Sequence, residues 1–176
     1  NPSASHFSGA VVAKDESAFF MIPQFTNKLV RCKFRDDSMQ SFGGFPTSVV
    51  DPSFFGGAVA DDGGIWLAPW GASAIVRFDP AKETMDAYTF FDETGCCPGG
   101  GLRRAFAGAV NLNGAIWMCP ALSRSFVRVN PSNGDFRTYS QWPEGYDVSL
   151  AAKSRSCSAT GDDIWLPPYE SQAHLL

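Results

Sequence analysis

The sequence predicts an all-β protein built as a β-propeller-type array of four-stranded blades. The main observation is a repeat of 46 to 51 residues that recurs along the 176-residue chain. Composition agrees with it, because aromatic residues make up 14% of the chain, charged residues only 18%, and 17 Gly and 12 Pro supply turns. No stretch shows a long apolar period of 3.6 residues, so the pattern does not favour substantial helix.

The repeat is clearest in a short apolar motif that ends in proline. Its four copies span residues 18–23, 64–69, 115–120 and 163–168, and their closing prolines lie 46, 51 and 48 residues apart. Upstream segments with a Phe-x-Gly-Ala-Val-like pattern keep the same phase at residues 7–11, 55–59 and 106–110. Agreement at several landmarks indicates true internal repetition, which outweighs local readings of secondary structure.

Each complete repeat contains four strand-like runs separated by Gly, Asn, Asp and Pro, which favour turns. Proline has no N–H to donate to a neighbouring strand, so we expect the closing proline to end the second strand. Four short strands in a repeat of this length are typical of a propeller blade. The blades are predicted at about 7–50, 51–104 and 105–153, with an incomplete one at 154–176.

These limits give about three and a half blades, whereas closed propellers have roughly four to eight. An incomplete array exposes a blade face and a sheet edge, both of which tend to associate with other chains. Three arrangements would cover them. The chain is part of a longer propeller, two copies combine, or other protein subunits cover the open end.

Charge and hydropathy exclude several classes of function. Lys and Arg total 14 and Asp and Glu total 18, so the formal charge is −4, without the basic surplus typical of nucleic-acid binding. No run approaches the ~20 apolar residues that a membrane-spanning helix needs. The acidic pairs at 36–37, 61–62 and 162–163 lack the spacing of a calcium loop. We therefore expect no nucleic-acid partner, no membrane span, and no metal or other cofactor.

Five cysteines are present without the Cys-x-x-Cys spacing that zinc sites favour. We expect most of them to be small buried apolar residues. The alternative is one disulfide between the loop that contains Cys96 and Cys97 and another cysteine. The cysteine content, and a chain that starts at Asn1 rather than Met, favour a processed protein that is exported or in an organelle lumen.

Three arginines occupy equivalent positions in the first three blades, namely Arg31, Arg77 and Arg128. One interpretation is that this once-per-blade position binds an anion or an acidic partner protein. The other is that each arginine pairs with a carboxylate on the adjoining blade. Arg103 and Arg104 end the longest irregular segment, residues 93–104, which is the loop that we expect to contact a partner.

A tryptophan also recurs once per blade, as Trp66, Trp117 and Trp165. Repeated aromatic rings would serve as stacking platforms for sugars in a carbohydrate-binding propeller. The other interpretation is that each ring belongs to the core between blades, because each lies between Ile and Leu or Met in a second strand.

The combination of Phe-x-Gly-Ala-Val, Ile-Trp-x-x-Pro, Val-Arg-x-Asp/Asn-Pro and a following aromatic residue resembles the propeller repeats of the streptogramin-lyase group. The resemblance covers nearly the whole chain, and it implies the fold. It would also imply a catalytic histidine and a metal held by acidic side chains near the central channel. The two histidines, His6 and His174, lie at the extremities and outside the matching strands, so they do not fit that role.

We therefore expect a β-propeller that is not an enzyme and that serves as a structural or protein-binding subunit of a larger assembly. Its partners would be other protein subunits or the remainder of a longer propeller chain. The alternative function is a carbohydrate-binding, lectin-like propeller. The third is a remnant or part of a lyase-like propeller enzyme.

Overall fold

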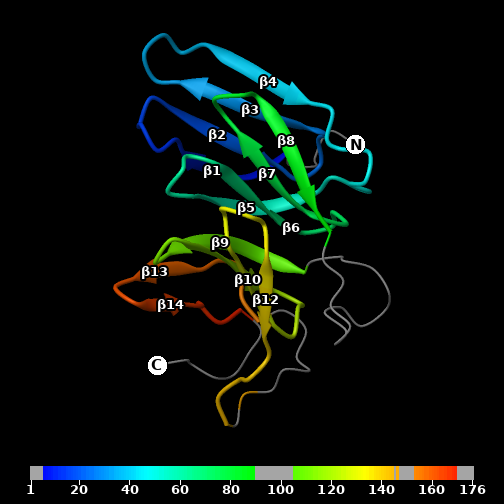
Figure 1. Cartoon of the computed structure of the whole chain (residues 1–176), viewed down its shortest axis with the longest axis vertical. Coiled ribbons are helices and arrows are strands. Elements are labelled where there is room, and N and C mark those ends of the chain that lie inside the picture. Colours follow the sequence, from blue (N-terminus) through cyan, green and yellow to red (C-terminus); the bar gives the residue numbers. More distant parts are fainter. Residues whose placement is uncertain (1–5, 90–104, 145, 147–152, 170–176) are drawn as a thin grey trace.

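A computed structural model describes residues 6–89, 105–144, 146 and 153–169 of the chain. The predicted all-β class is confirmed, because the described residues form strands, turns and bends and no helix. Three antiparallel sheets have four strands each, in sequence order, and a fourth sheet has two. Figure 1 shows the sheets following one another from the N-terminal sheet at the top to the two-stranded sheet below. Each sheet is one blade of a propeller array.

The first blade consists of β1 (Phe7–Val12), β2 (Ala18–Pro23), β3 (Lys28–Lys33) and β4 (Met39–Gly43). The second consists of β5 (Phe54–Val59), β6 (Ile65–Pro69), β7 (Ile75–Asp79) and β8 (Thr84–Tyr88). The third consists of β9 (Phe106–Leu112), β10 (Ala115–Pro120), β11 (Phe126–Val129) and β12 (Phe136–Tyr139). The fourth contains β13 (Ser158–Thr160) and β14 (Asp163–Trp165). In the three complete blades the second strand ends at the repeated proline, as its missing N–H predicts.

The first strands of successive blades lie side by side, because β1 contacts β5, β5 contacts β9, and β9 contacts β13. Direct polar links join the first pair. The Ser8 hydroxyl donates to the Phe54 carbonyl at 3.1 Å and accepts from the Gly56 amide at 3.2 Å. Crowding of the first strands is what a propeller requires, since its blades radiate from a shared axis.

Each blade has two faces, which we name by the neighbour that they meet. The forward face looks toward the next blade in the chain, and the backward face looks toward the preceding one. Between the first and second blades, Phe20 and Leu29 of a forward face share a core with Leu67 and Phe78 of a backward face. All four side chains are almost fully buried, and such burial stabilises the fold by roughly 1.5–3 kcal/mol for each of them.

The interface between the second and third blades repeats this arrangement. Trp66 and Ile75 of the second blade's forward face share a core with Phe106, Ile116 and Val127 of the third blade's backward face. Each of these residues is at most 1% exposed. The recurrence of one interface explains the high aromatic content and the low charge, because both faces of a blade are buried.

The structure corrects the predicted alignment of one first strand. Cross-strand pairing places Phe54, rather than Phe55, opposite the closing Pro69. The predicted segment 55–59 is therefore displaced by one residue from its equivalents in the other two complete blades, whose first phenylalanine lies opposite the proline. All three first strands have a one-residue register shift near this end. The displacement comes from the tandem pair Phe54 and Phe55, because the predicted segment begins at the second of the two phenylalanines.

Both ends of the array leave apolar side chains exposed in the part of the chain that the structure describes. On the backward face of the first blade, Val12, Phe34 and Met39 are 52%, 52% and 72% exposed. At the other end, Tyr139 is 42% and Trp165 is 46% exposed. The residues at equivalent positions in the second blade are less exposed because that blade has neighbours on both sides: Val59, Met85 and Tyr88 are half-buried, and Trp66 is fully buried.

The turn between β11 and β12 imposes a strict requirement for glycine. Gly134 has a φ of 78°, and a Cβ at this position would lie 2.1 Å from Cε1 of Tyr88 in the neighbouring blade. We expect Gly134→Ala to lower the free energy of unfolding by about 1–3 kcal/mol in urea denaturation, through backbone strain and displacement of Tyr88. Gly161→Ala is the control, since Gly161 has a φ of 61° but no atom within 4 Å of its Cβ position. Equal losses in the two variants would show that the contact with Tyr88 contributes nothing.

Candidate functional site

The three equivalent arginines all lie on forward faces, each paired across strands with the aromatic residue of the second strand. The pairs are Phe20 with Arg31, Trp66 with Arg77, and Trp117 with Arg128. Because forward faces meet the next blade, the arginines belong to the interfaces between blades where a next blade is present. Their partners nevertheless differ from blade to blade.

Arg31 pairs with the adjoining blade, as one of the two interpretations predicts. Its Nη2 atom lies 3.3 Å from Oε1 of Glu83, in the turn between β7 and β8. The same atom donates to the side chain of Gln40, and the guanidinium carbon lies 5.2 Å from the centroid of the Phe42 ring. The buried Nε atom of Arg31 has no hydrogen-bond partner.

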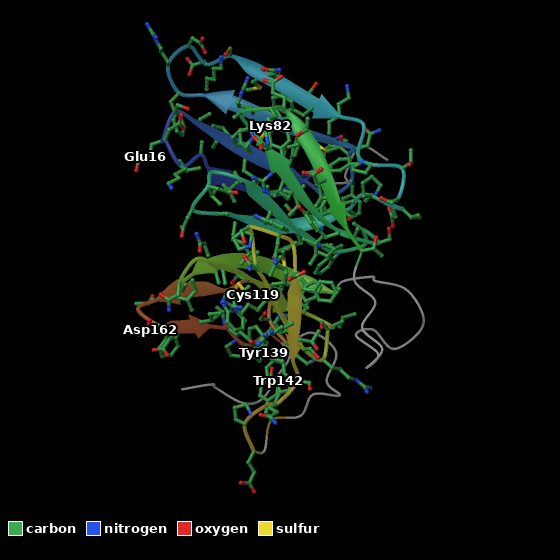
Figure 2. All side chains as sticks on the ribbon, viewed as in Figure 1. Glu16, Lys82, Cys119, Tyr139, Trp142 and Asp162 are labelled. Atoms are coloured by element: carbon green, nitrogen blue, oxygen red, sulfur yellow. A yellow bond between two sulfur atoms is a disulfide. The ribbon has the colours of Figure 1, made fainter. Side chains whose placement is uncertain are left out.

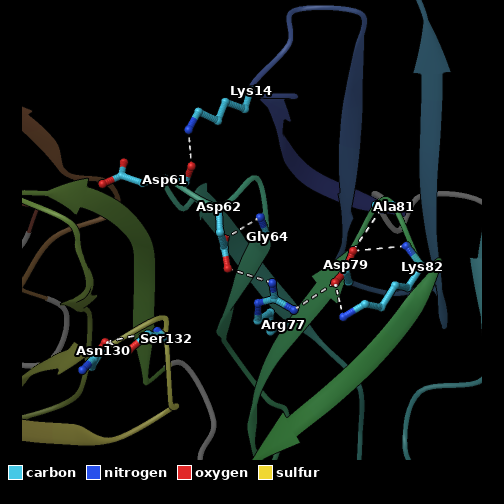
Figure 3. Close-up of polar contacts among 10 residues, drawn as sticks. All are labelled: Lys14, Asp61, Asp62, Gly64, Arg77, Asp79, Ala81, Lys82, Asn130 and Ser132. Carbon is cyan, nitrogen blue, oxygen red and sulfur yellow. Dashed lines mark hydrogen bonds and ion pairs between the residues drawn. The ribbon is translucent and has the colours of Figure 1, made fainter.

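Arg77 pairs within its own blade, which differs from the prediction of a carboxylate on the adjoining one (Figure 3). Its Nη2 atom lies 2.9 Å from Oδ2 of Asp62, and its Nη1 atom lies 3.5 Å from Oδ2 of Asp79. The position equivalent to Glu83 in the third blade is Gly134, which offers no carboxylate. Arg77 therefore turns to the acidic residues beside it.

The hydrogen bonds and the ion pair between Asp62 and Arg77 shift the pKa values of both side chains. Burial alone would raise the pKa of Asp62, but the Gly64 amide and the Arg77 guanidinium outweigh burial and hold that pKa below its ordinary value. Burial would likewise lower the pKa of Arg77, yet the hydrogen bond and charge of Asp62 leave it raised. Asp62 is 47% exposed in its side chain, so solvent screens much of the attraction.

Asp62→Asn should therefore reduce thermal stability more at pH 7 than in strong acid. A carboxyl whose pKa is lowered in the folded state stabilises it above the unfolded pKa, here the ordinary 3.8. That contribution disappears as the pH falls through the folded pKa. We expect a Tm deficit for the variant at pH 7, worth less than about 1 kcal/mol, and a smaller one at a pH near 2.5. A deficit of the same size at both pH values would contradict the assignment.

Arg128 has no ion pair within the described residues, in contrast to the first two arginines. Its guanidinium carbon lies 6.0 Å from the Trp117 ring centroid, and Arg137 lies directly across the sheet from it. Arg103 and Arg104, with the rest of segment 93–104, lie outside the described residues.

Burial of the repeated tryptophans follows the presence of a next blade. Trp66 is fully buried, Trp117 is partly buried against Tyr139 with ring centroids 5.2 Å apart, and Trp165 is 46% exposed. Every one of these rings lies on a forward face, so the ring is less exposed where the next blade along the chain is more complete. The ring of Trp66 is thus closed to any surface ligand, which removes it from the predicted set of sugar-stacking platforms.

A cleft of about 590 Å³ opens between the first and second blades, on the side of their hairpin turns. Lys14, Asp15, Arg31, Asp62 and Asp79 bring charges of both signs to its lining. The ammonium of Lys14 donates to the Asp61 carbonyl across the cleft (Figure 3). Among the described residues, no three His, Cys, Asp or Glu side chains gather in a way that could hold a metal ion.

The structure contains a disulfide that the sequence does not predict. Cys119, at the end of the third blade's second strand, is bonded to Cys157, directly before β13. Figure 2 shows Cys119 between the third and fourth blades. Of the other cysteines, Cys32 is free and buried as expected, whereas Cys96 and Cys97 lie outside the described residues. The expectation of simple buried thiols is therefore wrong for the bonded pair.

No protein-family model matches the sequence, and no curated protein sequence does either. No helix in the described part of the chain is long and apolar enough to cross a membrane. Solved structures match in fold. Virginiamycin B lyase from Staphylococcus aureus matches with a TM-score of 0.67 and 13% identity over 92% of this chain and 48% of that chain.

A catalytically inactive variant of that lyase, solved with quinupristin, matches with a TM-score of 0.68 and 15% identity over 96% of this chain and 50% of that chain. The WD40 repeats of RRP9 match with a TM-score of 0.58 and 15% identity over 76% of this chain and 38% of theirs. The chain thus spans about half the length of the lyase structures. At these identities the likeness shows the fold alone, and the chain is a β-propeller array similar to virginiamycin B lyase.

Proposed function

We propose that this chain is a non-catalytic propeller scaffold that binds other protein surfaces through its open blade faces. The observation that carries the proposal is the apolar backward face of the first blade. It exposes Phe34 and Met39, although the equivalent face of the second blade is a buried core. A cluster of exposed apolar side chains on a regular sheet is typical of an interaction surface.

The internal interfaces indicate what would cover this face. Every backward face that is covered within the chain meets a sheet with a large apolar or aromatic residue in its second strand, such as Phe20 or Trp66. The occupant is therefore a flat apolar protein surface, as presented by another blade of a propeller. Arg31 and Arg77 serve the scaffold rather than a partner, because carboxylates of the second blade already pair with them.

The test is the association state of residues 1–176, measured by light scattering across a range of concentrations. We expect oligomers that Phe34→Lys shifts toward monomer, because a charge placed on the face opposes its burial. Phe25→Lys is the matched control, since Phe25 is 59% exposed but lies in the loop after β2. A stable monomer at every concentration, or equal effects of the two variants, would overturn the proposal.

The absence of catalysis is proposed too, and quinupristin provides its test. Quinupristin is the compound found with the inactive lyase variant. We expect residues 1–176 to leave it unchanged over a long incubation followed by chromatography. Turnover that Arg31→Gln or another substitution in the cleft removes would show instead that the chain is an enzyme.

The disulfide supports the expectation of an exported or lumenal location. A bond between Cys119 and Cys157 persists in oxidising compartments and is rare where glutathione keeps thiols reduced. We therefore propose an oxidising compartment. Mass spectrometry of alkylated protein from its natural source should show these two thiols protected and Cys32 modified once the protein is unfolded.

A further inference from the structure

The outer half of the third blade's forward face carries an unusual pair of charges. In the complete blades the repeated arginine lies opposite one residue of the fourth strand. That residue is Gln40 in the first blade, Asp86 in the second and Arg137 in the third. Two like charges directly opposite each other destabilise a sheet. The third blade therefore holds a cationic pair, Arg128 and Arg137, that lacks a carboxylate among the described residues.

The interface between the first two blades shows how the repeated arginine can be paired with a carboxylate. There, the turn between the third and fourth strands of the next blade brings Glu83 against Arg31. Glu83 has a φ of 55°, and the residues at the same turn position, Asp37 and Gly134, have φ values of 54° and 78°. The same turn in each blade thus presents one left-handed residue toward the preceding forward face, and in two of three blades it is acidic.

The described part of the fourth blade provides no such turn, since it contains only β13 and β14. These two strands correspond to the inner half of a blade. On the same forward face of the third blade, Tyr139 of β12 is 42% exposed, and Figure 2 shows Tyr139 on the part of the third blade away from the second. Among the described residues β14 pairs with β13 alone, and the edge of a sheet is where a further strand can bind.

We propose that this surface, made of Trp117, Arg128, Arg137, Tyr139 and the edge of β14 away from β13, docks an acidic β-hairpin of a partner protein. The proposal rests on the proposed scaffold function and names one class of its partners. The first strand of the hairpin pairs with β14, its apolar side chains cover the aromatic rings, and a carboxylate in its turn lies between the two guanidinium groups. The docked hairpin completes the fourth blade as a four-stranded sheet.

A second copy of this chain does not fit the same place. Its exposed acidic turn, which contains Asp37, belongs to a complete four-stranded sheet. Docking that turn on Arg128 would force β1 and β2 of the copy into the space that β13 and β14 already fill. A separate two-stranded hairpin meets no such obstacle.

The probe is a cyclised peptide of residues 74–89, which contains the β7–β8 hairpin and Glu83. Cyclisation is needed because an isolated two-stranded hairpin is marginally stable in water. Its binding to residues 1–176 is measured by fluorescence anisotropy at low and high salt. We expect binding that weakens at least about five-fold with Arg128→Gln/Arg137→Gln and about as much with Glu83→Gln in the peptide. High salt should weaken it as well.

The control variant, Lys33→Gln/Arg35→Gln, removes the same charge from the first blade and should bind the peptide as the wild type does. Equal binding by all variants, or no binding at all, would overturn the proposal. Equally tight binding of linear polyglutamate would show that the surface binds any polyanion and does not select a hairpin. Loss of peptide binding in a longer form of the protein with a complete fourth blade would show that the same chain supplies the hairpin. That result would overturn the proposal that a partner protein supplies it.

A second measurement does not depend on the peptide. Arg137→Glu converts the like-charge pair into an opposite-charge pair with Arg128, so we expect the Tm of the free protein to rise by about 1–4 °C. A fall in Tm would show that the two arginines do not oppose each other. The light-scattering test of the first blade addresses the opposite end of the array, so either proposal can fail without the other.

Discussion

Trp66→Ala should lower the free energy of unfolding by about 3–5 kcal/mol, the largest loss that we expect from a single substitution. The indole is fully buried at the interface of the second and third blades, and its ring centroid lies 5.0 Å from that of Tyr88. Removing it leaves a cavity that two rigid sheets cannot close. Urea denaturation followed by intrinsic fluorescence measures the loss, and a Tm drop on the order of 10 °C should accompany it.

Two variants distinguish the contribution of the buried ring from that of the indole N–H group. Trp165→Ala removes the equivalent ring from the open end, where it is 46% exposed, and we expect it to cost less than about 1 kcal/mol. Trp66→Phe should cost much less than the alanine variant, because the buried Nε1 of Trp66 has no hydrogen-bond partner and Phe20 fills the same position in the first blade. Similar losses from the alanine variants of Trp66 and Trp165 would contradict the blade-by-blade account of burial.

Removal of the disulfide should have the second largest effect. Cys119 and Cys157 are 38 residues apart, and closing a loop of that length restricts the unfolded chain enough to stabilise the fold by about 3–4 kcal/mol. Cys119→Ser/Cys157→Ser should lower the Tm, and dithiothreitol should lower the wild-type Tm toward the same value. The variant itself should not respond to dithiothreitol.

Cys32→Ser is the control for this experiment, because Cys32 is buried but unbonded. Its Tm should still fall on reduction. The loss of the bond should also act locally, since Cys157 precedes β13 and fastens the fourth blade to the third. Faster proteolysis between 153 and 169 in the reduced protein, with the first two blades still protected, is the expected pattern. Uniform cleavage along the chain would contradict a local role.

The fold could be predicted because each copy of the sequence repeat corresponds to one blade. A proline, which ends the second strand of each complete blade, and an aromatic residue three positions before it recur at nearly constant spacing. A stack of equivalent sheets accounts for both. Repeat spacing of this kind is a local pattern, which sequence reasoning reads directly. The burial of Trp66 could not be read in the same way, because Trp165 lies between Ile164 and Leu166 in the same pattern and is 46% exposed.

The partners of the arginines could not be predicted in the same way. Arg31 and Arg77 occupy identical positions, yet their carboxylates differ because the facing turn contains Glu83 in one case and Gly134 in the other. That difference is visible only when the turn of one blade is placed over the face of another. The bond between Cys119 and Cys157 escaped prediction for the same reason, since spacing alone does not show which thiols meet.

The second blade is the only one whose two faces are both covered by complete blades within the described residues. In a molecule whose units touch only their neighbours, opening an end unit breaks one contact surface, whereas opening the middle unit breaks two. Native fluctuations should therefore begin at the ends and reach the centre last. Amide protons of β6 and β7 would then exchange with solvent only as fast as the whole structure unfolds.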